Sequence, residues 1–66
     1  MSLLYELMKK QGEQSDREFA MRLGISRQLW QMTRRGQRRI GESLLLAIPV
    51  TFPELQAELL MFLREK

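Results

Sequence analysis

The fold of this chain is decided by the stretch SDREFAMRLGISRQLWQMTRRG, residues 15–36, which holds the signals for two short helices and the turn between them. Ser15 precedes Glu18 by three residues, which is the capping-box spacing that opens a helix. Gly24 stands where the first helix needs a left-handed residue in order to end, and Ser26 can cap the second helix. These signals predict helices over residues 16–23 and 27–35.

The apolar residues of the same stretch are spaced so that the two helices can cross closely. Helices that cross steeply through a short turn need a small residue near the crossing, and Ala20 is placed for that role. We expect Phe19, Ala20 and Leu23 to face the core, with Ile25 in the corner of the turn. Trp30 is expected to tie the second helix to the core; the alternative is an exposed platform on which a nucleotide base stacks.

Helical signals continue on both sides of this stretch. Ser2 can cap a first helix over residues 2–10, and Gly36 ends the helix that contains Trp30. A fourth helix is expected from a Gly41 cap to Pro49, because proline interrupts the hydrogen bonding of a helix. Four methionines are expected to fill gaps in the core, namely Met8, Met21, Met32 and Met61.

After Pro49 the sequence predicts a linker over residues 50–52 and then a last helix. Thr51 and Glu54 have the spacing of a second capping box, and Pro53 is tolerated in a first turn. The inward stripe of this last helix is expected to be Leu55, Leu59, Phe62 and Leu63. The prediction for residues 1–66 is therefore a single all-α domain of five short helices without a strand.

Length and composition exclude several classes of protein. The chain has 66 residues and neither cysteine nor histidine, so it lacks the usual ligands of zinc and haem and the side chains of most nucleophile–base pairs. We therefore expect no enzyme activity, no cofactor and no small-molecule ligand. Its longest apolar runs, such as residues 59–63, are far too short to span a membrane. A cytoplasmic protein, bacterial or phage-encoded, is expected.

Positive charge is confined to one third of the chain. The segment from Arg17 to Arg39 holds seven arginines and one acid, Glu18, and carries +6, whereas the other residues sum to −3. A phosphate backbone responds to such local charge density. The segment therefore favours nucleic acid as a partner, with an ordinary solvated surface as the alternative.

The order Ala20, three residues, Gly24, Ile25, Ser26, Arg27 resembles the lambda-repressor and Cro-like (XRE-type) helix-turn-helix family. The resemblance covers residues 15–36 closely and the five-helix plan more loosely. It implies a helix-turn-helix domain that binds double-stranded DNA with its third helix in the major groove. This family usually has an amide where the present chain has Asp16, so the phosphate contact of that position is not carried over.

The resemblance also implies which residues contact DNA. Base contacts are expected from Ser26, Arg27, Gln28 and Gln31, whose side chains can pair with guanine, adenine and several base edges. Phosphate contacts are expected from Arg34, Arg35, Arg38 and Arg39.

Two functions remain open from the sequence. The first is a small transcriptional regulator of the phage or plasmid repressor type, which binds DNA as a homodimer through Ala57, Leu60 and Met61 of the last helix. For these three residues the alternative is a broad buried helix. The second function is a protein-interaction adaptor or antitoxin module with the same helical fold, which would use the apolar last helix as its contact surface.

Overall fold

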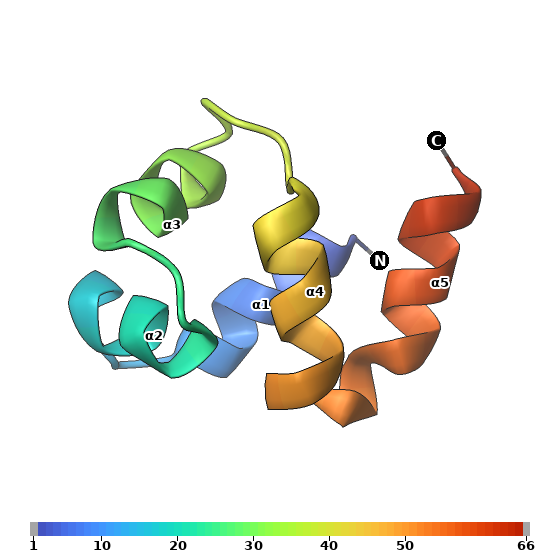
Figure 1. Ribbon diagram of the computed structural model, residues 1–66, viewed down its shortest axis with the longest axis horizontal. Helices are drawn as coiled ribbons and strands as arrows, with labels where there is room; N and C mark the ends of the chain where they lie inside the picture. Colours follow the sequence, from blue (N-terminus) through green and yellow to red (C-terminus); the bar gives the residue numbers. More distant parts are fainter. Residues whose placement is uncertain (1, 66) are drawn as a thin grey trace.

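The computed structural model describes residues 2–65, and it is all-helical within that range (Figure 1). Five α-helices and one short 3₁₀ helix follow one another, with no strand in residues 2–65. In chain order they are α1 (Leu3–Gln11), α2 (Asp16–Leu23), α3 (Arg27–Arg34), α4 (Glu42–Thr51), the 3₁₀ helix η1 (Pro53–Leu55) and α5 (Gln56–Arg64). The all-helical class predicted from the sequence is confirmed, and α1 to α3 begin and end within one residue of their predicted bounds.

Serine side chains cap the first three helices as the sequence predicts. The Ser15 hydroxyl accepts a hydrogen bond from the Glu18 amide at 3.1 Å, and the Glu18 carboxylate accepts one from the Ser15 amide at 3.0 Å. Ser2 and Ser26 each accept from the amide three residues further on, at 3.1 and 3.0 Å. Each cap satisfies a backbone donor that the first turn of a helix leaves without a partner.

The turn between α2 and α3 depends on the conformation of Gly24. Its φ of 74° lies in the left-handed region, where a residue with a Cβ is strained. The amides of Gly24 and Ile25 both donate back to the Ala20 carbonyl, and this closes the end of α2. Residues 24–26 therefore form the predicted turn of three residues.

All five α-helices contribute to one core. Trp30 is fully buried and packs on Phe19, with ring centroids 4.8 Å apart, and Phe19 stacks on Phe52 at 5.8 Å. The predicted role of Trp30 as a core residue is confirmed, and the alternative of an exposed stacking platform is wrong. The other buried apolar residues are Leu3, Leu7, Ala20, Leu23, Ile40, Leu44, Ile48, Leu55 and Leu59.

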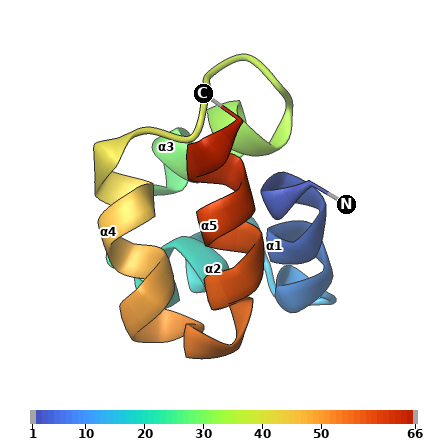
Figure 2. The same ribbon diagram turned by 90° about the vertical axis from the view of Figure 1, so that its right-hand side faces the viewer.

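The helices are arranged so that α2 and α3 lie at one end of the molecule and α5 at the other, with α4 between them (Figure 1). In the perpendicular view α1 and α5 lie side by side and run in opposite directions (Figure 2). Because α5 packs on α1, η1 and α4, its outer face points away from α3. The arginine-rich segment and the outer face of α5 are therefore on different sides of the protein.

The prediction that Pro49 ends the fourth helix is wrong. Helix α4 continues through Pro49 to Thr51, and the amide of Phe52 still donates to the Ile48 carbonyl at 2.7 Å. Proline in the last turn removes only one backbone hydrogen bond, and its fixed φ is compatible with a helix. Continuing the helix brings Phe52 into the core, so residues 50–52 do not form a linker.

The second capping box is also absent from the described residues. No side chain caps η1 or α5, and the Glu54 carboxylate instead binds the Lys10 ammonium of α1 at 2.8 Å. The ion pair joins the start of the C-terminal segment to α1. An interaction between residues far apart in the sequence has therefore replaced the local one that the spacing favoured.

Several apolar side chains predicted to be inside are exposed. Met8, Met21 and Met61 are 41%, 71% and 53% exposed, so only Met32, which is half-buried, resembles a gap-filling residue. Leu63 is likewise 45% exposed instead of completing the inward stripe of α5. These helices are short and each buries one narrow face, because a chain of this size can remove only ~60% of its surface from water.

No single helix in residues 2–65 has the length and apolar character needed to cross a membrane. By length and composition only, the pair Glu42–Thr51 and Pro53–Arg64, bent by 115°, passes the same test.

Candidate nucleic-acid interface

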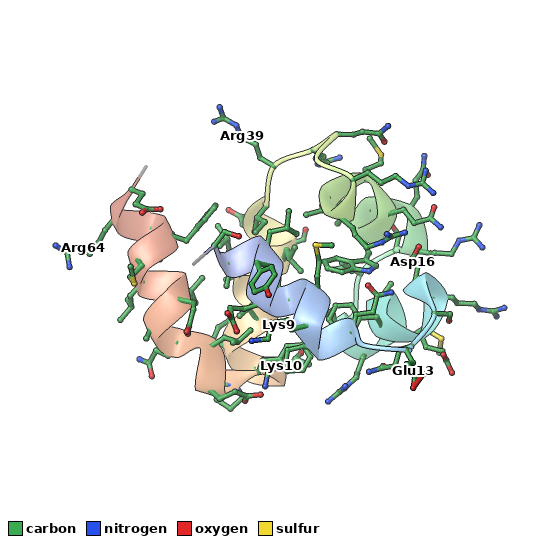
Figure 3. The ribbon with its side chains drawn as sticks, turned by 180° about the vertical axis from the view of Figure 1, so that it is seen from behind. Lys9, Lys10, Glu13, Asp16, Arg39 and Arg64 are labelled. Atoms are coloured by element: carbon green, nitrogen blue, oxygen red, sulfur yellow. The ribbon has the colours of Figure 1, made fainter. Side chains whose placement is uncertain are left out.

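The arginines of the basic segment all come from α2, α3 and the loop that follows α3. Six of the seven are exposed, and these are Arg17, Arg22, Arg27, Arg35, Arg38 and Arg39. Figure 3 shows Arg39 projecting from the loop after α3, whereas Arg64 lies at the far end of α5. The exposed cations of the basic segment are therefore carried by α2, α3 and the loop after α3.

The four residues predicted to read bases lie at the start of α3. Arg27 and Gln28 are exposed, Gln31 is half-buried, and Arg27 and Gln31 share one face because they are one helical turn apart. Ser26 is exposed and caps the helix. A hydroxyl can accept one hydrogen bond and donate another, so capping does not remove Ser26 from the candidate contacts.

Arg34 has a partner that the sequence analysis did not identify. Its Nε and Nη2 atoms donate to Oδ1 and Oδ2 of Asp16 at 3.1 and 2.9 Å, which is the bidentate geometry of a strong ion pair. The side chains of Arg34 and Asp16 are only 31% and 15% exposed. The guanidinium of Arg34, and after it the amide of Gln11, holds the pKa of the Asp16 carboxyl below its ordinary value.

The side chain of Gln11 connects this ion pair to Trp30. Its Nε2 donates to Asp16 Oδ1 at 2.8 Å, and its Oε1 accepts from the Trp30 indole Nε1 at 3.1 Å. We call Gln11, Asp16, Trp30 and Arg34 the polar network. Sequence reasoning missed Gln11, which lies one residue beyond the predicted end of the first helix and carries no motif.

A second residue that was not singled out is Arg17. With Arg27 it borders a shallow depression of about 340 Å³ on the surface of α2 and the turn. Ala20, Met21 and Ile25 also line the depression. Arg17 of α2 and Arg27 at the start of α3 therefore border the same depression. The signal available in the sequence was that Arg17 belongs to the basic segment.

The loop arginines border a larger groove. Arg38 and Arg39 line an open hollow of about 670 Å³ whose apolar wall includes Leu4, Ile40 and Phe62. Arg35 follows α3 directly and is exposed. None of these three arginines forms an ion pair with an acid of residues 2–65, whereas Arg34 does.

The residues predicted to form a dimer contact lie on the outer face of α5. Leu60 and Met61 are 52% and 53% exposed, and Ala57 is exposed as well. Helix α4 adds Leu46 and Val50, which are 68% and 84% exposed and which the sequence analysis did not single out. The alternative of a broad buried α5 is wrong.

Within residues 2–65 no group of three or more acidic, histidine or cysteine side chains is arranged to hold a metal ion. Comparison of the chain with models of protein families found no match, and comparisons with curated proteins and with solved structures found none either.

Proposed function

We propose that this chain is a sequence-specific DNA-binding transcriptional regulator of the lambda-repressor-like helix-turn-helix type, with α3 as its recognition helix. The observation that carries the proposal is the pair of serine-capped helices α2 and α3, joined at a left-handed Gly24, with Arg27 and Gln28 exposed at the start of α3. Such a pair can place the first half of the second helix in the major groove. The regulator proposed is a small repressor of the phage or plasmid type.

The proposed contacts divide into two classes. Arg27, Gln28, Gln31 and the Ser26 hydroxyl read base edges, because arginine pairs with guanine and glutamine with adenine. Four exposed arginines bind phosphates without reading sequence, and these are Arg17 of α2, Arg35, Arg38 and Arg39. The phosphate contact predicted for Arg34 is not part of the proposal, because its guanidinium is already bound to Asp16.

Selection of binding sites from a random duplex pool, followed by fluorescence anisotropy, tests the proposal. Arg27→Ala should weaken binding to the selected site by about 1–3 kcal/mol and leave binding to random duplex nearly unchanged. Arg38→Ala should weaken binding to both duplexes alike and lower the salt slope by about 1. Failure of the wild-type protein to retain any duplex at low salt would contradict the proposal.

We further propose that the protein binds DNA as a symmetric dimer through Ala57, Leu60 and Met61. The exposed apolar side chains of α5 favour a second copy, and two recognition helices about 34 Å apart would reach successive major grooves. Sedimentation equilibrium with Leu60→Glu tests this arrangement. A dimer that persists in this variant would place the interface elsewhere.

The second candidate function is a protein-interaction module. It is favoured by Leu46 and Val50 of α4, which add apolar surface that DNA binding does not require. Absence of duplex binding together with loss of a partner complex in Val50→Glu would favour this function over the first.

A further inference from the structure

We propose that Asp16 is a positioning residue for α3: it holds Arg34 directly and Trp30 through Gln11, and so fixes the orientation of the helix and keeps Arg34 away from DNA phosphates. This inference rests on the proposed function of α3 in DNA recognition. It assigns to the polar network a role in choosing the DNA site, in addition to its role in the fold.

The contacts of the network are all made on one side of α3. Trp30 and Arg34 are four residues apart and therefore lie on the same face of the helix. Their hydrogen bonds end on Gln11 at the end of α1 and on Asp16 at the start of α2. Helix α3 is thus connected to α1 through Trp30 in its middle and to α2 through Arg34, its last residue.

Apolar packing alone leaves the orientation of α3 weakly determined. Only Trp30 and Thr33 are buried in this helix, and the Thr33 hydroxyl is used within it, donating to the Leu29 carbonyl at 2.8 Å. Burial of apolar surface is non-directional. A bidentate arginine–carboxylate pair, by contrast, has a fixed geometry. The network therefore supplies the directional contacts that set how Arg27 and Gln31 face the groove.

The charge of Asp16 has a second consequence. In the proposed binding mode the start of α2 approaches the phosphate backbone, where an unpaired carboxylate would be repelled. Pairing with Arg34 neutralises the carboxylate and engages the guanidinium. Removing the charge of Asp16 would release Arg34 for a phosphate contact that carries no sequence information.

Glu13 provides a matched control for this experiment. It lies three residues before Asp16 and is exposed at the outer edge of the molecule, whereas Asp16 lies between α2 and α3 (Figure 3). Asp16→Asn and Glu13→Gln remove the same charge from the protein. Only the first breaks the ion pair with Arg34.

Binding of the selected site and of random duplex is measured for both variants over a range of salt. Asp16→Asn should bind random duplex more tightly, with a salt slope steeper by about 0.9, and its preference for the selected site should fall by about tenfold or more. Glu13→Gln should keep the preference and the slope. Adding Arg34→Gln to Asp16→Asn should abolish the gain on random duplex, because the released guanidinium is gone.

Trp30 is the only tryptophan of the chain and reports the position of α3 without DNA. The NMR resonance of its indole N–H should shift in Asp16→Asn and stay in place in Glu13→Gln. If Asp16→Asn does not fold, Arg34→Lys keeps the charge but loses the bidentate pair, and it should lose site preference while remaining folded. Equal behaviour of Asp16→Asn and Glu13→Gln, or full site preference in Arg34→Lys, would overturn the proposal. If the wild-type protein binds no duplex, the proposed function fails, and the indole resonance still decides whether Asp16 positions α3.

Discussion

Trp30→Ala should remove a large part of the stability of this protein. The indole is fully buried, lies 4.8 Å from the ring of Phe19 and donates to Gln11 at 3.1 Å. Truncating a buried tryptophan costs about 3–5 kcal/mol. A chain of this length has a free energy of unfolding of roughly 3–10 kcal/mol, so the loss is between about a third and all of it. Trp30→Phe keeps an aromatic ring but leaves the side-chain oxygen Oε1 of Gln11 without its donor, at a cost of about 1–3 kcal/mol.

The free energy of unfolding of both variants is measured by urea denaturation. The transition is monitored by circular dichroism, because both variants lack the only tryptophan and its fluorescence. The urea concentration at the midpoint should be highest for the wild type, lower for Trp30→Phe and lowest for Trp30→Ala. The dependence of the free energy of unfolding on urea concentration should change little. Met21→Ala is the control, since Met21 is 71% exposed and its loss should change the free energy of unfolding by no more than about 0.5 kcal/mol. An unchanged midpoint in Trp30→Ala would refute the burial argument and return the indole to the candidate contacts with bases.

Acid should destabilise the protein just below the ordinary Asp16 carboxyl pKa of 3.8, because the Arg34 guanidinium lowers that pKa in the folded state. The stabilisation is present above the unfolded pKa and is lost as pH falls through the folded pKa. Asp16→Asn should therefore show a shallower decrease of its thermal midpoint in that range, and an equally steep decrease would assign the effect to other carboxylates. Gly24→Ala should cost roughly 1–2 kcal/mol in chemical denaturation, because a Cβ is strained at a φ of 74°. Gly24→Asn should cost less, since asparagine tolerates the left-handed region, and equal losses would contradict a backbone origin of the effect.

The first three helices could be predicted from the sequence because their signals are local. A serine cap acts over three residues, and a left-handed glycine acts on the turn that contains it. The C-terminal third was predicted less well, because contacts across the fold decide it. Phe52 is drawn into the core beside Phe19, and Lys10 binds Glu54, and neither contact has a signature in the nearby sequence.

The same distinction applies to the candidate site. The exposure of Arg27 and Gln28 follows from helical periodicity around Trp30, and the structure agrees. The ion pair of Asp16 and Arg34 joins residues 18 apart, and a local pattern contains no information about such a pair. The sequence alone therefore predicts which residues of α3 are exposed more reliably than it predicts the contacts that orient this helix.

The small core makes stability and orientation depend on the same residues. Because α3 buries only Trp30 and Thr33, a substitution that loosens the network should both weaken the fold and misplace the side chains proposed to read bases. A loss of DNA binding alone therefore cannot distinguish the two effects. Asp16→Asn separates them, since it should lower stability while raising affinity for random duplex through the released Arg34, and reduced stability by itself gives no reason for tighter binding. The sign of the change on random DNA thus separates the release of Arg34 from a loss of stability, and the preference for the selected site tests the proposed recognition role of the network.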